Sequence, residues 1–317
     1  MAVNIHKPMT TEMKRRVLEA LRERSGYLSG ETLANRLGTS RVSVWRHIRS
    51  LEKEGYLIET SRNGYRLVSS PDLLLPFEFP GLEQKIHYFS EIGSTMDAAR
   101  ELAKKGAGEG TIVIAEAQTH GRGRLGREWL SPKGGIYFTL ILRPKISPVN
   151  APRINLMASV AVAVTIRKLF GLDAGLKWPN DVLIEGKKVC GILAEMDAET
   201  DVLNFVNLGI GINANTSIPR FEKTATSLKH AVGKDISRKE FLGALLVEIE
   251  HRQASLMEAS LLEQWRKLSV TLGKDVRIVA PGEVIVGRAI DVDTTGALII
   301  RQRNGSLKKV VAGDCTQ

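Results

Sequence analysis

The sequence has little cysteine and no long apolar run. Cys190 and Cys315 are the only cysteines among 317 residues, and neither lies in a Cys-x-x-Cys pair or at metal-ligand spacing from a histidine. A disulfide framework and a zinc site are therefore not supported. No apolar run approaches the roughly 20 residues that span a bilayer, and residues 1–11 lack the apolar core of a signal peptide. We therefore expect a cytoplasmic protein without a membrane partner.

Missing catalytic motifs narrow the possible chemistry. The chain contains no Gly-x-Ser-x-Gly elbow, no His-Glu-x-x-His motif and no evident cysteine nucleophile. An enzyme of this kind would work by positioning its substrates and stabilising charge at phosphorus. Acidic residues are also in deficit, because 45 Lys and Arg against 35 Asp and Glu leave a formal charge of +10. This excess points to polyanionic partners.

The basic excess is concentrated in residues 1–68, which carry 13 Lys and Arg against 7 Asp and Glu. Helical spacing of apolar residues predicts helices over 11–24, after Ser29 and over 40–55. Asn63-Gly64 between two β-rich runs predicts a hairpin. Three helices followed by a hairpin are typical of a winged helix-turn-helix, in which the later helix enters the DNA major groove.

The third helix of this segment presents a candidate DNA-recognition face. Val44, Ile48 and Leu51 repeat at helical spacing and face the core, which turns polar side chains toward solvent. Arginines on the hairpin would contact phosphates, which fix the register without reading sequence. An alternative is a small helical domain whose arginines form a solvated face or a protein contact. The predicted DNA-binding residues are Arg41, Ser43, Arg46, His47, Arg62 and Arg66.

Prolines mark the first domain boundary. Pro71, Pro76 and Pro80 lie in a segment with a Ser-Ser pair, and proline removes backbone donors and stops helices. We therefore expect a DNA-binding domain over 1–68, a linker over 69–84, a central domain over 85–268 and a C-terminal domain over 269–317.

The central region mixes strands with helices. Residues 154–170 are strongly apolar at helical spacing and predict a helix buried against a sheet. We expect a helix over 96–105 with Ser94 or Thr95 as its N-cap. The free backbone amides at the start of this helix would either bind a polar ligand or serve only the cap. Glu185-Gly186 indicates a hairpin. The expected strands cover 86–89, 111–117, 135–143, 176–184, 187–196 and 204–213.

A loop rich in arginine and glycine, residues 118–129, joins two of these strands; we call it the arginine loop. Gly121, Gly123 and Gly126 permit positive φ and close approach to a ligand, and three arginines bring permanent positive charge. The loop is neither a Walker A loop nor a dinucleotide fingerprint, because the required residues are missing. It suits a polyphosphate or an activated phosphate ester. On composition alone, a nucleic-acid-binding segment fits as well.

Polar residues on the following strands favour the phosphate interpretation. Proline and polar residues over 177–181 are unusual for a central strand, and Lys188 directly precedes an apolar strand. Together with the arginine loop, Lys177, Asp181 and Lys188 supply anion neutralisation and a possible carboxylate for Mg²⁺. The plain alternative is that each lysine extends to the surface beside a core strand.

Six motifs in this order are highly specific when taken together: Gly93-Ser94-Thr95, Gln118, residues 121–127, residues 177–181, residues 188–193 and residues 209–213. They resemble the biotin protein ligase family, in its form fused to a DNA-binding domain. The resemblance covers nearly the whole chain. It implies an α+β protein with a winged helix-turn-helix, a central α/β ligase domain with a mixed sheet, and a C-terminal SH3-like β-barrel. Short β-rich runs after residue 275 agree with a small barrel or sandwich.

The resemblance implies an ATP-dependent ligase that is also a biotin-responsive repressor of biotin biosynthesis genes. Biotin and Mg·ATP would give biotinyl-5′-adenylate and pyrophosphate, and a lysine amine of a biotin carboxyl carrier protein would then expel AMP. The implied partners are that carrier, operator DNA and a second copy in a ligand-induced homodimer. Two alternatives are a related ligase for lipoate or octanoate, and a regulator that binds biotin or its adenylate without transfer.

The resemblance also implies roles for individual residues. The arginine loop becomes a lid over biotin and its adenylate, and Met96 replaces the asparagine that the family often has there. The expected catalytic residues are Lys188, Arg124, Lys177 and Asp181, with Asp181 as the candidate Mg²⁺ ligand. The expected biotin-binding residues are Ser94, Thr95, Met96, Gln118, Arg122, Gly123, Arg124 and Lys188. The expected ATP- and adenylate-binding residues are Arg122, Arg124, Arg127, Trp129, Lys177, Asn180, Lys188 and Asn213.

Overall fold

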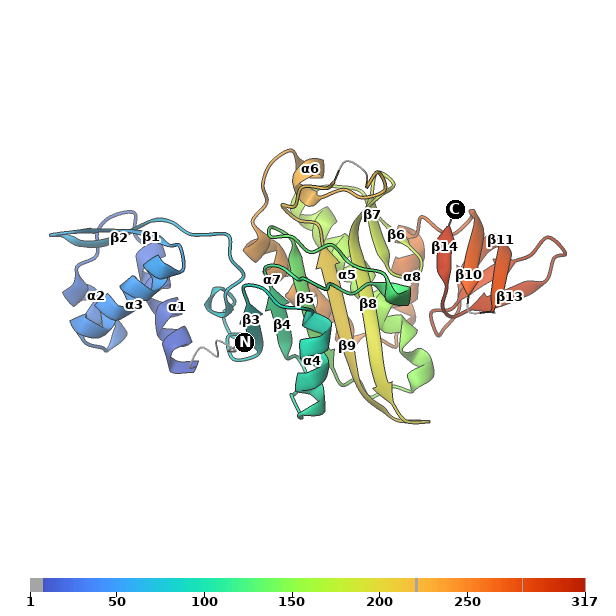
Figure 1. Cartoon of the computed structure of the whole chain (residues 1–317), viewed down its shortest axis with the longest axis horizontal. Coiled ribbons are helices and arrows are strands. Elements are labelled where there is room, and N and C mark those ends of the chain that lie inside the picture. Colours follow the sequence, from blue (N-terminus) through green and yellow to red (C-terminus); the bar gives the residue numbers. More distant parts are fainter. Residues whose placement is uncertain (1–7, 220–221, 281, 317) are drawn as a thin grey trace. The chain divides into compact units, whose positions relative to one another are not determined.

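The chain forms two compact units that divide after Tyr88 (Figure 1). The computed structural model describes residues 8–219, 222–280 and 282–316. The first unit contains helices and a two-stranded sheet, and the second contains a seven-stranded and a five-stranded sheet. This mixture of separate helical and sheet regions confirms the expected α+β class.

The first unit contains three helices and a hairpin, as expected. Ser29 and Ser40 cap the second and third helices, because their hydroxyls accept hydrogen bonds from backbone amides at 3.0 Å and 3.1 Å. Gly38 ends the second helix with a φ of 64°. Buried side chains from all three helices, among them Val17 and Ile48, form the core. The elements are α1 (Pro8–Arg22), α2 (Gly30–Leu37), α3 (Arg41–Lys53), β1 (Leu57–Ser61) and β2 (Gly64–Ser69).

The proline-rich segment after β2 packs onto these helices. It contains a 3₁₀ helix, η1 (Pro76–Glu78), whose Phe77 ring is buried with its centroid 6.1 Å from that of Tyr56. Arg22 of α1 donates hydrogen bonds of 3.0 Å and 2.9 Å to the Glu78 carboxylate. The segment predicted as a linker therefore contributes to the core of the first unit.

A seven-stranded sheet organises the second unit. Its strand order is β3-β4-β5-β9-β8-β7-β6, and neighbours from β4 to β6 pair antiparallel. The hairpin between β7 and β8 turns at Glu185 and Gly186, which both have positive φ. The strands are β3 (Ile86–Phe89), β4 (Ile112–Ala115), β5 (Ile136–Leu142), β6 (Ala174–Lys177), β7 (Asp181–Ile184), β8 (Lys187–Ala198) and β9 (Leu203–Ile212).

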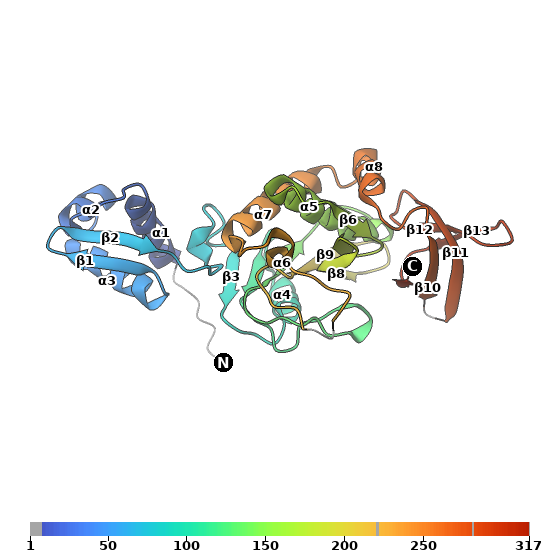
Figure 2. The ribbon, with the colours of Figure 1, turned by 90° about the horizontal axis from the view of Figure 1, so that it is seen from above.

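Helices cover both faces of this sheet. The long apolar helix α5 (Pro152–Phe170) lies on one face with α7 (Arg238–Ala254), and α4 (Thr95–Lys104) lies on the other (Figure 2). The expectation that no apolar run approaches a membrane-spanning length is wrong, because residues 148–170 are long and apolar enough by length and composition. Of their most apolar window, 72% is buried inside the protein. We therefore assign α5 as the core helix of this unit. This unit also contains the helices η3 (Pro148–Asn150), α6 (Leu228–Val232) and α8 (Ala259–Leu268), besides a short 3₁₀ turn in the arginine loop.

The single strand expected over 176–184 is wrong. The chain forms two short strands there, and β6 and β7 pair antiparallel with Lys177 opposite Asp181. The reversal occurs at Trp178 and Pro179, whose peptide bond is cis. Proline has no amide hydrogen for a sheet ladder, which places it in the turn. The reversal brings Lys177 and Asp181 side by side at one end of the sheet.

The C-terminal segment forms a five-stranded antiparallel sheet of order β13-β12-β11-β10-β14. Alternate side chains such as Ile278 and Ile300 are buried in its core. The last strand places Asp314 next to the larger domain. The strands are β10 (Asp275–Ala280), β11 (Glu283–Val292), β12 (Leu298–Arg301), β13 (Leu307–Val310) and β14 (Asp314–Thr316).

Candidate functional site

Two adjoining cavities of about 130 Å³ and 850 Å³ lie beside the arginine loop. Both are lined by Gln118, Trp129 and Lys188. Every residue predicted to bind biotin or ATP lines at least one cavity, with the exception of Ser94. The Ser94 hydroxyl is buried, and within the described parts of the chain it makes no hydrogen bond.

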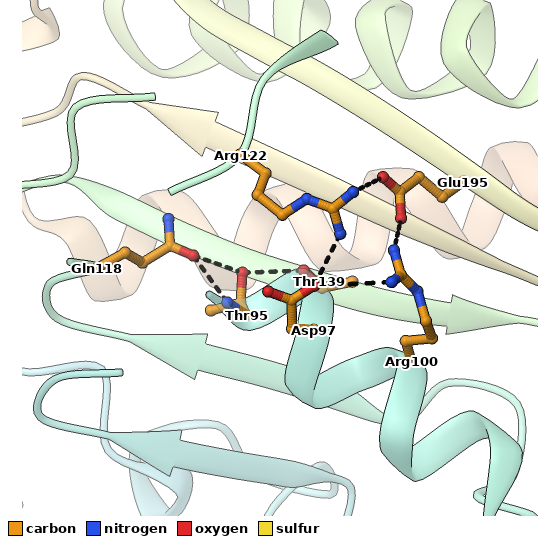
Figure 3. Close-up of polar contacts among 7 residues, drawn as sticks. All are labelled: Thr95, Asp97, Arg100, Gln118, Arg122, Thr139 and Glu195. Carbon is orange, nitrogen blue, oxygen red and sulfur yellow. Dashed lines mark hydrogen bonds and ion pairs between the residues drawn. The ribbon is translucent and has the colours of Figure 1, made fainter. Parts of the chain in front are cut away.

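At the smaller cavity, polar side chains form a buried hydrogen-bond network (Figure 3). The amide and hydroxyl of Thr95 donate to the Gln118 side-chain oxygen at 2.8 Å and 3.0 Å. Thr139 of β5 donates to the Thr95 hydroxyl at 2.9 Å, and the Gln118 amide donates to Ser131 at 2.9 Å. Because each partner is itself fixed, the network holds the side chains of Thr95 and Gln118 in place at the cavity wall.

Glycines form the wall of this cavity along β8 and β9. A Cβ added to Gly209 would lie 2.5 Å from the sulfur of Met96, and one added to Gly211 would lie 2.4 Å from Nε1 of Trp129. Gly191 stands directly opposite Gly211 in the sheet, and a Cβ there would lie 2.8 Å from the same indole ring. These glycines therefore provide room for Met96 and Trp129.

The arginine loop folds back on itself. Trp129 donates a backbone hydrogen bond to Gly121, and Gly123 donates one to Arg127, both at 2.8 Å. A short 3₁₀ turn, η2 (Arg124–Gly126), forms the tip. The expectation of positive φ at three glycines is wrong for Gly121 and Gly123, because only Leu125 and Gly126 in this loop have it. Gly121 is needed for close packing instead, since a Cβ would lie 2.3 Å from the Trp129 carbonyl.

Arg122 points away from the cationic end of the site. Its guanidinium donates to the carboxylates of Asp97 on α4 and Glu195 on β8, at 2.8 Å and 2.5 Å (Figure 3). Arg100 binds the other oxygen of Glu195. The side chain of Arg122 is thus occupied by an ion-pair network, while its backbone lies in the lining of the cavity.

The cationic end of the site centres on Lys188. Its ammonium lies 2.7 Å from Asp181 and 5.2 Å from the centre of the Trp129 ring. The side chain is 31% exposed and lines both cavities. A lysine held between a carboxylate and an indole face is well placed to accept a phosphate or carboxylate ligand.

Arg124 and Arg127 connect the arginine loop to β14. Arg124 donates to Asn180 at 2.9 Å and to the Gly313 carbonyl at 3.0 Å. Burial lowers the pKa of Arg124, and the nearby Asp181 carboxylate opposes that shift. Arg127 forms an ion pair with Asp314 and, through that hydrogen bond, lowers the pKa of the Asp314 carboxyl. The C-terminal sheet therefore contributes to the same site.

The remaining predicted residues fix the rim of the larger cavity. Lys177 lines it beside the cis peptide. The Asn180 amide donates to the Ile192 carbonyl at 2.9 Å, and the Asn213 amide donates to the Thr226 carbonyl at 3.0 Å. Both side-chain amides thus hold the backbone of this rim in place, and both residues line the larger cavity.

Metal binding by protein ligands alone is not supported. Among the residues that the structure describes, no three or more His, Cys, Asp or Glu side chains gather to hold an ion. Mg²⁺ bound mainly through substrate phosphates needs only one or two carboxylates. Asp181 fits that limited requirement, because it lines both cavities next to Lys188.

The face of α3 differs from the predicted one. Arg41 and Arg46 are exposed as expected, but Ser43 and His47 are half-buried against the domain. Burial lowers the pKa of His47, which favours its neutral form. The fully outward positions missed by the prediction belong to Val42, Trp45 and Arg49, and the Arg49 guanidinium lies 5.8 Å from the Trp45 ring.

The two arginines of the hairpin also differ from each other. Arg62 is exposed near the turn, whereas Arg66 donates to Glu59 at 2.6 Å and lies over the Tyr27 ring at 5.2 Å. Arg62 is therefore available to an external phosphate, and Arg66 already has an anionic partner.

Several site residues were missed because their partners are distant in sequence. Thr139 is an ordinary strand residue, and Asp97, Glu195 and Asp314 are single acids without a local motif. The one usable signal was the proximity of Asp97 to the predicted helix start at Ser94-Thr95. The expected side-chain cap there is wrong, because Ser94 precedes α4 without a capping hydrogen bond and the Thr95 hydroxyl donates to Gln118.

Three family models match successive parts of the chain. A helix-turn-helix domain matches residues 14–66, the biotin/lipoate A/B protein ligase family matches 88–213, and the biotin protein ligase C-terminal domain matches 271–316. The bifunctional ligase/repressor BirA of Bacillus spizizenii is 39% identical over 92% of this chain and 94% of its own. The biotin–[acetyl-CoA-carboxylase] ligase of Mycobacterium tuberculosis is 35% identical over 73% of this chain and 88% of its own.

A solved structure agrees with these matches. The biotin protein ligase of Aquifex aeolicus in complex with biotin and ATP superposes with a TM-score of 0.64 and 32% identity, over 73% of this chain and 97% of that one. The site geometry, the three successive domains and the long BirA match lead to the same assignment. The chain belongs to the biotin protein ligase family, in the bifunctional form that combines a ligase with a DNA-binding repressor.

Proposed function

We propose that this chain couples biotin to ATP, forming biotinyl-5′-adenylate and pyrophosphate, and then transfers the biotinyl group to one lysine of a biotin carboxyl carrier protein. The observation that carries this proposal is the pairing of two chemically different ends in one site. The Thr95–Gln118 pair offers fixed neutral hydrogen-bond groups, and Lys188 and Arg124, which line the same smaller cavity, offer cations.

The neutral end suits the ureido group of biotin. A ureido group both donates and accepts hydrogen bonds, and the Thr95–Gln118 network supplies both kinds of partner. Lipoate and octanoate have no such group, so they would leave the buried Ser94 hydroxyl, which makes no hydrogen bond within the described parts of the chain, without a partner. Met96 and the glycine wall leave an apolar surface for the remaining ring atoms. We therefore favour biotin over the lipoate alternative.

The cationic end suits the reacting groups. The biotin carboxylate attacks the α-phosphorus of ATP, an acyl phosphate bond forms, and pyrophosphate leaves. Lys188 would neutralise both the carboxylate and the phosphoryl oxygens, which otherwise repel each other. Arg124 and Arg127 would stabilise the phosphates, and Lys177 and Asn180 would line their path. In the second step the carrier amine attacks the acyl carbon and AMP leaves.

The adenosine side would use the larger cavity. Trp129 offers an indole face there, and Asn213 lies in the lining. A bound Mg²⁺ would neutralise phosphate charge, with Asp181 as its candidate protein ligand. Biotin would lie against Ser94, Thr95, Met96, Gln118 and the backbone of Arg122 and Gly123.

The first unit would bind operator DNA. Arg41 and Arg46 lie on the exposed face of α3, and Arg62 lies on the wing. Trp45 and Val42 add apolar surface between these cations, which suits contact with thymine methyl groups in the major groove. Repression by a ligand-induced homodimer in the cytoplasm belongs to the same proposal, and sedimentation velocity with and without biotin and ATP tests the dimer.

Biotin-dependent exchange of labelled pyrophosphate into ATP tests the ligase activity directly. The exchange should require biotin and Mg²⁺, and lipoate or octanoate should not replace biotin. Absence of exchange with saturating biotin and Mg·ATP would contradict the proposal. A chain that exchanges pyrophosphate but never labels a carrier protein would instead be a regulator that makes the adenylate without transferring it.

A further inference from the structure

The side chain of Arg122 ties the arginine loop to two other elements of the same unit. It donates to Asp97 in the first turn of α4 at 2.8 Å and to Glu195 on β8 at 2.5 Å. Figure 3 shows the guanidinium of Arg122 between these two carboxylates. Arg100 also reaches both acids, because it binds Glu195 and lies 3.9 Å from Asp97. Two cations and two anions thus compensate each other, so the network requires no external anion.

The ion pairs of Arg122 hold the whole arginine loop and not only one residue of it. The backbone bonds from Trp129 to Gly121 and from Gly123 to Arg127 hold the loop as one folded piece. Arg122 and Gly123 line the smaller cavity, and Trp129 lines both cavities. Releasing Arg122 would therefore free the cover of the biotin end together with the indole beside the adenylate.

The two acids of this network differ in how exposed their side chains are. Both acids pair with Arg122 and Arg100, but Glu195 is only 25% exposed and is the more enclosed partner. Asp97 is 57% exposed. Because it lies in the first turn of α4, its negative charge also interacts favourably with the positive end of the helix dipole. A role for Asp97 in helix stability alone would leave the arginine loop unaffected by its removal.

We propose that Asp97 and Glu195 are positioning residues that hold the arginine loop closed through Arg122 and thereby set how long biotinyl-5′-adenylate stays bound. The inference rests on the proposed function, because it needs the adenylate to form. Neither acid lines the smaller cavity, so neither touches the reacting atoms. They act on the residence time of the intermediate and not on the chemical step.

The expected effects are moderate, because the ion pairs are partly exposed. Each such pair shifts an opening equilibrium by about 1.5- to 5-fold. Glu195→Gln and Asp97→Asn should each raise the dissociation rate of the adenylate by that factor. The double variant should raise it further, but the two factors do not multiply, because both acids share Arg122. Asp97→Glu keeps the charge and should stay close to the unmodified rate.

The test uses the full chain and its own product. Adenylate formed on the protein from biotin and radiolabelled ATP is chased with excess unlabelled biotin and ATP, and its release is followed by filter binding. The matched control is Asp173→Asn, which breaks another exposed arginine pair, with Arg167, outside both cavities. Thermal unfolding of every variant shows whether the fold is retained.

Three results support the proposal when they occur together. The acid variants release adenylate faster while pyrophosphate exchange stays unchanged, the Asp173→Asn control behaves as the unmodified chain, and Glu195→Gln adds little in an Arg122→Gln background. Higher salt should also speed release from the unmodified chain more than from the double variant. Unchanged release from the double variant would overturn the proposal. Failure of the unmodified chain to form adenylate would instead contradict the proposed function.

Discussion

The ammonium of Lys188 lies 2.7 Å from the carboxylate of Asp181, across the turn between β7 and β8. The pair is enclosed by Trp129, whose ring centre is 5.2 Å from the same ammonium. An anionic ligand entering this corner competes with Asp181 for a cation that is already oriented. The lysine therefore needs little rearrangement when negative charge develops beside it.

Lys188→Ala should impair adenylate formation far more than folding. Loss of a directed cation is expected to lower the rate about 10²- to 10³-fold. The free energy of unfolding should change by about 1 kcal/mol or less, because little core area is removed. Pyrophosphate exchange and urea unfolding measure the two effects. Lys187→Ala, at the exposed neighbouring position, is the control. Parallel losses of activity and stability would contradict the assignment.

Thr139→Val should weaken biotin binding without altering the chemical step. The change removes the hydroxyl that donates to Thr95 at 2.9 Å but keeps the shape of the side chain. One neutral hydrogen bond corresponds to about 0.5–1.5 kcal/mol, so KM for biotin should rise about 2- to 12-fold with kcat nearly constant. Thr165→Val is the matched control, since the buried hydroxyl of Thr165 donates to the Ala161 carbonyl within α5, outside this network. An equal effect of both variants on KM would argue against a network at the biotin end.

Arg124→Gly should give a ligase that forms adenylate and then loses it. The guanidinium bonds of Arg124 to Asn180 and Gly313 hold the tip of the arginine loop, and two bonds to a charged donor disappear together. We expect release about tenfold faster or more, seen as biotin labelling of bystander proteins. Arg303→Gly in the exposed β12–β13 turn is the control. Adenylate retention equal to that of the unmodified chain would refute this role.

Arg46→Ala and Trp45→Ala should weaken operator binding and spare ligation. Each removes one outward side chain of α3, and a base-edge contact is worth about 1–3 kcal/mol. Binding is measured by fluorescence anisotropy on a duplex that the unmodified chain selects from a random pool. Replacing thymine by uracil in that duplex should affect the unmodified chain more than Trp45→Ala. The control is Arg36→Ala on α2. It also removes one positive charge, but Arg36 is already paired with Glu23. Loss of ligation in either α3 variant would contradict separate sites.

The sequence predicted the features that depend on local chemistry. Ser29 and Ser40 cap helices as expected, and Glu185-Gly186 forms the expected hairpin, because caps and tight turns use neighbouring residues. The ligand residues gathered from separate motifs do line shared cavities. The reversal at Pro179 was missed, since two short β-rich runs read like one longer strand.

The sequence could not predict pairings between distant charges. Arg122 lies 25 residues from Asp97 and 73 residues from Glu195, and no local pattern specifies either partner. From the sequence, Arg122 was therefore expected to bind the ligand. On α3, helical spacing identified Ile48 as core, yet it did not separate the fully outward Trp45 from the half-buried His47.

The pair of glycines at Gly191 and Gly211, which leaves one position of the sheet without side chains, limits how this site can change over evolution. These residues face each other across β8 and β9, and the Trp129 ring occupies the space that side chains would fill. A side chain added at either position would displace the indole, and with it a wall that both cavities share. New substrate preferences are therefore more accessible through Met96, whose flexible side chain can be exchanged without moving the strands.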